Sequence, residues 1–359
     1  MDELFKTRHY DRVETDLGMV AELGVTHVRY GIPFHRVNPA PAIFDWSFPD
    51  RALKTLRQHR LVPIVDLLHF GVPDYIHDFQ NPQLPELFAD YAARFANRFP
   101  WVRYYTPVNE PLITAQFSAR DGMWNERLRS DRAFARALIN VAASAVRARA
   151  AITQTTSNAI FIQSDTCEAY HPTHRDSVVT SDFYNELRFI GFELVYGRPV
   201  RGMVRTYLLD NGIDKSELSW FEANGTDSNC IAGNDYYATS EKDVEPSGAL
   251  HEAKHRLGYA RLSRQYYERL GVPLIHAETN MAGPGAVGWL QEQWAEVNRV
   301  RETLPIRGFT WYGFINHVDW DTELLEDNGR ENTCGLVSLD RVPNATHAAY
   351  RKLIANLQE

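Results

Sequence analysis

The sequence predicts a parallel α/β barrel of the (β/α)8 class from which the first strand is missing. Strand-like and helix-like stretches alternate along all 359 residues. The strand-like stretches are nearly continuous apolar runs, as expected for a parallel sheet whose faces are covered by helices. No linker, charge block or low-complexity segment divides the chain. We therefore expect residues 1–359 to form one domain, since barrels of this size commonly do.

The chain opens on a helix, because apolar residues recur at helical spacing over residues 11–23 and Gly24 is a good stop. The same spacing predicts further helices over residues 50–59, 84–99, 133–152, 182–194, 251–269, 289–304 and 346–357. Runs rich in β-branched and aromatic residues alternate with them. These runs predict strands over residues 26–32, 62–70, 103–108, 159–165, 230–237, 273–280 and 306–314.

The strand count is seven, whereas a closed barrel needs eight. Because the chain opens directly on a helix, the missing strand would be the first one. Three explanations stay open: the barrel is open on that edge, another element fills the gap, or one strand has escaped detection. An unpaired strand edge is a liability in folding and association.

Two glutamates stand at the ends of predicted strands. Glu110 follows a short strand and precedes Pro111, which disfavours regular structure at the residue before it. Glu278 ends the apolar run that begins at residue 273. A parallel barrel keeps its catalytic groups at the carboxyl ends of its strands, and retaining glycoside hydrolysis needs two carboxylates about 5–5.5 Å apart. We expect Glu110 and Glu278 to face each other across one cleft.

Seven motifs resemble, in order along nearly the whole chain, those of glycoside hydrolase family 1, the retaining β-glycosidases. TPVNEP (106–111) resembles the acid/base motif of that family, and HAETN (276–280) resembles its nucleophile motif. The other five are VRYGIPFHRV (28–37), VDLLHFGVPDYI (65–76), GNDYY (233–237), TWYGFINHVDW (310–320) and CGLVSLD (334–340). The chain departs from the family at Phe70, Asp235, Ala277 and Asp319, and it has no counterpart of the glutamine on the family's first strand.

The resemblance implies that Glu110 is the general acid/base and Glu278 the nucleophile. Arg29 would supply positive charge to Glu278, and Tyr236 would donate a hydrogen bond to it, with Asn234 nearby. The residues expected to bind the sugar are Asn109 at the 2-hydroxyl, His69, Trp311 beneath the ring, and Asp319 with Trp320 at the outer hydroxyls. Structural roles also fit: a buried ion pair for Arg29, a turn cap for Asn109, and core packing for His69, Tyr236 and Trp311.

Net charge, cysteine placement and the absence of other motifs limit the kinds of partner and cofactor that we expect. A net charge of −8 without a basic run argues against nucleic acid and anionic membranes. The partner that the resemblance implies is a small glycoside or oligosaccharide. The scattered Cys167, Cys230 and Cys334 are expected to be free thiols. We see no signal peptide or membrane span in the sequence, which favours the cytoplasm. No nucleotide-binding, serine-hydrolase or metal motif appears, so we expect no cofactor and no metal.

The sequence therefore predicts a β-glucosidase-like retaining hydrolase of β-O-glycosidic bonds. One alternative is a non-catalytic carbohydrate-binding protein on a decayed barrel, suggested by the missing strand and the altered HAETN motif. A transglycosidase would use the same two glutamates. The sequence leaves a homo-oligomer open.

Overall fold

The computed structural model describes residues 2–358, and its centre is a curled sheet of parallel strands that follow one another in sequence order. The strands are β1 (His27–Gly31), β2 (Val62–Asp66), β3 (Tyr104–Thr106), β4 (Ile160–Thr166), β6 (Cys230–Asp235), β9 (Leu274–Glu278) and β10 (Ile306–Phe309). Each pairs in parallel with the next. All seven predicted strands are confirmed, and within residues 2–358 no eighth strand joins this sheet.

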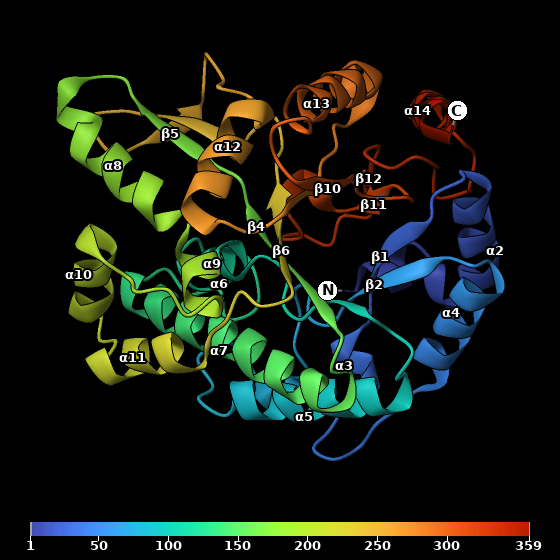
Figure 1. The fold of residues 1–359 in the computed structure, drawn as a ribbon, viewed down its shortest axis with the longest axis horizontal. Helices are drawn as coiled ribbons and strands as arrows, with labels where there is room; N and C mark the ends of the chain where they lie inside the picture. Colours follow the sequence, from blue (N-terminus) through green and yellow to red (C-terminus); the bar gives the residue numbers. More distant parts are fainter. Residues whose placement is uncertain (1, 359) are drawn as a thin grey trace.

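Helices surround the strands (Figure 1). Those that match the predictions are α2 (His9–Glu22), α4 (Ser47–Gln58), α5 (Leu84–Arg98), α7 (Asp131–Thr155), α13 (Ala286–Val300) and α14 (Ala345–Gln358). The helix predicted over residues 182–194 is two helices, α8 (Val178–Leu187) and α9 (Ile190–Val195). Further helices were not predicted: α1 (Glu3–Lys6), α3 (Phe34–Val37), α6 (Pro111–Ala119), α10 (Gly202–Asp210) and α11 (Lys215–Asn224). None of the helices in the described part of the chain is both long and apolar enough to cross a membrane.

The helix predicted over residues 251–269 is wrong in its first part. The segment begins as strand β8 (Leu250–Glu252), which pairs antiparallel with β7 (Glu241–Val244). With β5 (Ala169–Pro172) these strands form a separate three-stranded sheet. Helix α12 (Tyr259–Leu270) starts only after Gly258, whose φ of 83° lies in the left-handed region that favours glycine.

Side chains of the parallel strands alternate between two environments. Ile64, Ile162, Ile275 and Ala277 form a small apolar cluster of their own. Their sequence neighbours on the same strands belong instead to the main core. Because successive side chains of a strand point to opposite faces, the small cluster fills the inside of the barrel and the main core lies between strands and helices.

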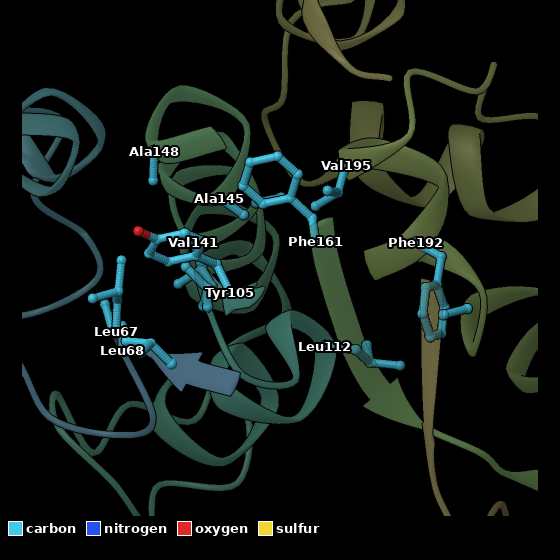
Figure 2. Close-up of a cluster of buried hydrophobic side chains, with 14 of the residues drawn as sticks. Leu67, Leu68, Tyr105, Leu112, Val141, Ala145, Ala148, Phe161, Phe192 and Val195 are labelled. Atoms are coloured by element: carbon cyan, nitrogen blue, oxygen red, sulfur yellow. The ribbon is translucent and has the colours of Figure 1, made fainter. Parts of the chain in front are cut away.

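The main core is densest where the sheet meets α7. Figure 2 shows Tyr105 of β3 and Phe161 of β4 beside Val141 and Ala145 of α7. These side chains are all buried. The small alanine lets α7 approach the sheet closely, which allows the two aromatic rings to fill the interface.

The sheet does not close between β10 and β1, and a cavity of about 1090 Å³ lies there. Its lining includes residues of both edge strands, among them His27 and Ile306, and the interior residues Ile162 and Ile275. The same cavity is lined by Glu278. The gap left by the missing strand is therefore continuous with the carboxyl end of the barrel, where Glu278 lies.

A chain of buried polar contacts braces β1 beside this gap. Arg341 donates from Nε and Nη2 to the two carboxylate oxygens of Asp16 on α2, at 2.8 Å each. His9 contacts Asp16 at 2.7 Å through Nδ1 and the hydroxyl of Tyr30 on β1 at 2.7 Å through Nε2. The segment before α14 is thus tied through α2 to an edge strand of the sheet.

We expect Arg341→Met to lower the free energy of unfolding by about 3–5 kcal/mol, because it leaves the buried Asp16 carboxylate without its cation. Urea unfolding measures the loss. The matched control is Arg94→Met, which removes an exposed ion pair to Asp90 at 2.8 Å and should cost less than about 1 kcal/mol. Equal, small losses in both variants would show that the Arg341 pair does not brace the fold.

Candidate active site

Glu110 lies at an abrupt break in the backbone. Strand β3 ends at Thr106, and helix α6 (Pro111–Ala119) begins immediately after Glu110. Glu110 itself has φ 38° and ψ 69°, a left-handed conformation that residues other than glycine rarely adopt. Proline after it disfavours the right-handed helical region, so the turn is built into the sequence. The break places the carboxylate at the carboxyl end of the barrel.

The structure brings Glu110 and Glu278 together from positions far apart in the sequence. Glu278 is the last residue of β9 and is 3% exposed. Carboxylate oxygens of Glu110, Glu278 and Asp235, the last residue of β6, lie within 4.8 Å of one another. The predicted meeting of the two glutamates in one site is confirmed by this geometry, and a third carboxylate joins them.

Arg29 of β1 is the cation of this site. Its Nη1 donates to Glu278 Oε1 and its Nη2 to Asn109 Oδ1. Nη2 also donates to Ser164 Oγ at 3.0 Å and lies 3.1 Å from Asp66 Oδ2. Burial lowers the pKa of Arg29, but Glu278 and Asp66 outweigh that effect and raise it, so the guanidinium stays charged. The guanidinium of β1 therefore contacts groups from β2, β4 and β9.

The hydrogen bonds of Asn109 fix which end of its amide remains available. Its Oδ1 accepts from Arg29 and, at 2.8 Å, from Ser164 Oγ. Asn109 is 2% exposed. With the oxygen engaged on both sides, its NH2 group is the part left to donate to a ligand, as the prediction for a sugar hydroxyl requires.

His69 and Trp311 both line the cavity next to Glu278. Nδ1 of His69 contacts Asp66 Oδ2 at 2.7 Å, which leaves Nε2 on the other side of the ring. Trp311 is buried, and its indole N–H donates to the carbonyl oxygen of Cys334 at 3.0 Å. Both residues thus lie where the predicted sugar contacts need them, each held by a hydrogen bond.

The prediction that Tyr236 donates to Glu278 is wrong. Its hydroxyl donates to Glu241 at 2.9 Å, and its ring stacks on Trp289 of α13. The donor to Glu278 is Tyr237, whose hydroxyl lies 2.9 Å from Oε2. Strand alternation explains the shift by one residue: Asp235 faces the barrel interior, so its neighbour Tyr236 must face the helices.

Asn234 does not point to the same side of the sheet as Asp235. It is the preceding residue on β6 and is fully buried, and successive side chains of a strand point to opposite faces. The inward positions of β6 are Ile231, Gly233 and Asp235. A Cβ on Gly233 would meet the side chains of Ser164 and Ala277 at 2.9 and 3.0 Å, which places this position inside the narrow barrel.

Asp319 and Trp320 are both engaged by other parts of the chain. The Asp319 carboxylate is buried and accepts from Lys6 Nζ, from the backbone N–H of Asn328 at 3.1 Å and from that of Gly329 at 2.6 Å. Trp320 packs against Phe70, with ring centroids 5.8 Å apart. The predicted sugar contact of Asp319 therefore gives way to an ion pair with the N-terminal helix α1 (Glu3–Lys6).

Sequence reasoning missed four residues of the site: Asp235, Tyr237, Ser164 and Asp66. The available signal was the period of two along the strands. Counting inward positions with a period of two, back from Asp235 on β6 and likewise on β4 and β2, selects Ser164 and Asp66 as inward polar residues near the strand ends. Without knowledge of how the strands pair, the sequence alone could not separate inward from outward positions.

Burial and the repulsion between neighbouring charges favour the neutral forms of several carboxyls in the site. Burial and the neighbouring charge of Glu278 raise the pKa of Glu110 well above its usual value. The same two causes raise the pKa of Asp235. On β4, burial raises the pKa of Asp165 to about 8. The carboxylates of Glu110, Asp235 and Glu278 are also spaced closely enough to share a cation. Because all the atoms that could bind it are oxygens, a hard cation such as Mg²⁺ or Ca²⁺ would suit this site.

Comparison with known proteins places these features in context. Residues 5–247 match the family model described as "Glycosyl hydrolase family 1". The family 1 β-glucosidase of Thermotoga maritima superposes with a TM-score of 0.85 at 16% identity, covering 98% of this chain and 87% of that one. The same β-glucosidase in complex with deoxynojirimycin gives a TM-score of 0.83 at 16% identity, with the same coverage. The (β/α)8 fold is thereby confirmed.

Curated relatives match at lower coverage of their own length. The 6-phospho-β-galactosidase of Lacticaseibacillus rhamnosus is 29% identical over 113 residues, which is 30% of this chain and 24% of that protein. Human lactase/phlorizin hydrolase is 21% identical over 96% of this chain, and the match spans 21% of that protein. Human klotho is 31% identical over 30% of this chain and 12% of its own. The chain thus spans a quarter or less of the length of these relatives.

We expect Glu110→Gln to stabilise the protein increasingly as the pH rises. A carboxyl whose pKa is raised by folding binds its proton more tightly in the folded state than in the unfolded one. The stability of the wild type must therefore fall as pH rises above about 4.5, the unfolded value, until the folded pKa is reached. The groups that act on Glu110 are Glu278, Asp165, Arg29 and Glu168. A glutamine at this position cannot ionise, so the stability of the variant does not fall with pH for this reason.

Urea unfolding of both proteins at pH 4.5, 6 and 8 provides the measurement. The advantage of the glutamine variant should be smallest at pH 4.5 and grow at each step. A difference in unfolding free energy that stays constant with pH would mean that folding does not raise the pKa of Glu110.

Proposed function

The chain belongs to glycosyl hydrolase family 1, and from this premise we propose that it is a retaining β-glycosidase acting on β-O-glycosidic bonds. The observation that carries the proposal is the spacing of Glu110 and Glu278, whose carboxylate oxygens lie within 4.8 Å of each other. An inverting enzyme separates its two carboxyls by about 6.5–9.5 Å to hold a water molecule between one of them and the sugar. The spacing here favours direct attack by a carboxylate.

In the first step, Glu278 attacks the anomeric carbon while Glu110 gives its proton to the departing glycosidic oxygen. A carboxylate–carbon bond forms, the carbon–oxygen bond breaks, and the alcohol leaves. In the second step, Glu110 takes a proton from water, the resulting oxygen nucleophile attacks the anomeric carbon, and Glu278 departs as carboxylate. Each glutamate thus returns to its starting protonation state.

The charges around the two glutamates support this division of roles. Glu278 accepts from Arg29 and from Tyr237, both of which favour its ionised form. Glu110 is neutral because of burial and of its proximity to Glu278. When Glu278 becomes an ester its charge disappears, so the pKa of Glu110 falls. The acid of the first step thereby becomes able to act as the base of the second.

Three further residues have proposed contacts with the sugar. The amide NH2 of Asn109 would donate to the 2-hydroxyl, an interaction that strengthens in the transition state of such enzymes. His69 would bind a ring hydroxyl through Nε2. Trp311 would pack against the apolar face of the ring. We propose that these residues and the two glutamates act within one catalytic domain, and that the reaction needs no cofactor.

Trapping the covalent intermediate tests the proposal. We expect a 2-deoxy-2-fluoro aryl β-glycoside to inactivate the protein with a stoichiometry of one, because fluorine slows the hydrolysis of the ester while a good leaving group keeps its formation fast. Peptide mass spectrometry should place the label on Glu278. The Glu278→Gln variant, with an unfolding transition like that of the wild type, should stay unlabelled. Transfer of the trapped sugar to an added alcohol rather than to water would identify a transglycosidase.

A label on another residue would contradict the assignment of the nucleophile. Absence of label and of aglycone release, in folded protein that still binds sugars in calorimetry, would favour a non-catalytic carbohydrate-binding protein instead.

The two neighbouring tyrosines provide a second prediction. Tyr237→Phe should lower kcat/KM for an aryl β-glycoside about 10- to 100-fold, because Glu278 loses a hydrogen bond to a charged group. Tyr236→Phe should leave kcat/KM within about threefold of the wild type and lower the free energy of unfolding by about 1–2 kcal/mol, because it loses a buried bond to Glu241. The reverse pattern would show that the tyrosine positions have been exchanged.

A further inference from the structure

Asp235 is a third carboxylate at the centre of the site, and the proposed two-glutamate mechanism does not use it. It ends β6, faces the barrel interior, and has oxygens within 4.8 Å of those of Glu110 and Glu278. Its side chain is 0% exposed. Neither of its oxygens has a hydrogen-bond partner among the described residues.

Such a group needs a partner. A buried polar atom without one costs on the order of 1–3 kcal/mol, and a charged one costs more. The neighbouring buried carboxylates each have at least one partner: Asp66 accepts from His69 through Oδ2 at 2.7 Å, although its Oδ1 has no partner among the described residues. Asp165 accepts from the backbone N–H of Leu112 at 3.2 Å. The exception made by Asp235 therefore points to a donor that the site receives from a ligand.

The charge balance of the site identifies the kind of donor. Three carboxylates meet beside one guanidinium, that of Arg29. All the nitrogens of that guanidinium already have partners: Nε contacts Thr106 at 3.4 Å, Nη1 contacts Glu278, and Nη2 contacts Asn109 and Ser164. No second cation among residues 2–358 is hydrogen bonded to these three carboxyls. Burial and the charge of Glu278 favour the neutral forms of Glu110 and Asp235, and a positively charged ligand beside them would favour their ionised forms instead.

The spacing of the three oxygens fits a single ammonium nitrogen. Charge-assisted N–H···O bonds are about 2.8 Å long, so two oxygens that accept from one tetrahedral nitrogen lie about 4.6 Å apart. The oxygens of Glu110, Asp235 and Glu278 lie within 4.8 Å of one another. A nitrogen carried on a sugar bound against Glu278 could therefore reach Asp235 without rearrangement of the strands.

We propose that Asp235 is a specificity-determining residue: with Glu110 and Glu278 it forms a cation-binding subsite, so that the sugar accepted by this protein carries a basic nitrogen. The inference rests on the proposed glycosidase function for the nature of the ligand. It does not depend on turnover, because the subsite acts in binding.

A matched pair of ligands isolates the charge. Deoxynojirimycin and 1,5-anhydroglucitol share their hydroxyls and differ mainly in the ring position, which is a protonated nitrogen in the first and an oxygen in the second. Calorimetry at pH 7 gives the ratio of their dissociation constants. We expect Asp235→Asn, which keeps the shape of the side chain but cannot ionise beside a cation, to reduce the preference for the cationic ligand about 10- to 100-fold.

Two variants control the experiment. Asp165→Asn removes a buried carboxyl that is already hydrogen bonded, and should leave the ratio unchanged. Asp235→Ser should give the same loss as Asp235→Asn, and it provides a second route if the first variant does not fold. Equal affinities for the two ligands in the wild type, or an unchanged ratio in both Asp235 variants, would overturn the proposal.

Substrates and metal ions complete the test. Among aryl β-glycosides with one hydroxyl replaced by an amino group, at least one should be cleaved faster than its parent sugar, and Asp235→Asn should reverse that order. If no glycoside is cleaved while the binding ratio behaves as expected, the proposed function fails and the subsite stands. Binding of Ca²⁺ or Mg²⁺ that is lost in Asp235→Asn, without discrimination between the two sugars, would assign the carboxylates to a metal and overturn the proposal.

Discussion

The arrangement of the site depends on the buried guanidinium of Arg29. Burying several carboxylates side by side is strongly unfavourable unless a cation offsets their repulsion. Arg29 offsets it through a planar fork that reaches Glu278, Asn109, Ser164 and Asp66 at once. A lysine at this position would supply the charge, but from a single nitrogen it could not hold partners on so many strands.

The contacts of Arg29 also show how a barrel concentrates chemistry at one end. Neighbouring strands each contribute an inward group near their carboxyl ends: Arg29 from β1, Asp66 from β2, Ser164 from β4, Asp235 from β6 and Glu278 from β9. Parallel register brings these ends to the same level. Yet β1 is an edge strand, so the main cation of the site lies on the least supported part of the sheet. The buried contacts from Arg341 through Asp16 and His9 to Tyr30 compensate for part of that missing support.

Sequence reasoning found the strands and both glutamates, because apolar runs and a proline-terminated turn are local signals. It failed where the answer depended on register or on distant partners. Tyr236 and Tyr237 are chemically identical, and only the inward orientation of Asp235 distinguishes their positions. Asp319 looked like a sugar ligand, but its environment is set by Lys6, which lies 313 residues away in the sequence. No local pattern encodes either fact.

The open edge of the barrel accounts for the altered environment of Asp319. With no strand between β10 and β1 in the described chain, the cavity there extends from the barrel interior to Glu278, and Glu3 and Thr7 line it. Helix α1 can therefore approach the loop that follows β10, where Glu3 accepts from the backbone N–H of Val318 at 3.1 Å and Lys6 pairs with Asp319. The groups around Glu278 come from the adjacent strands β1 to β9 and do not need the eighth. What the missing strand changes is the wall between β10 and β1, so departures in sugar recognition are expected there, while the paired glutamates remain in place.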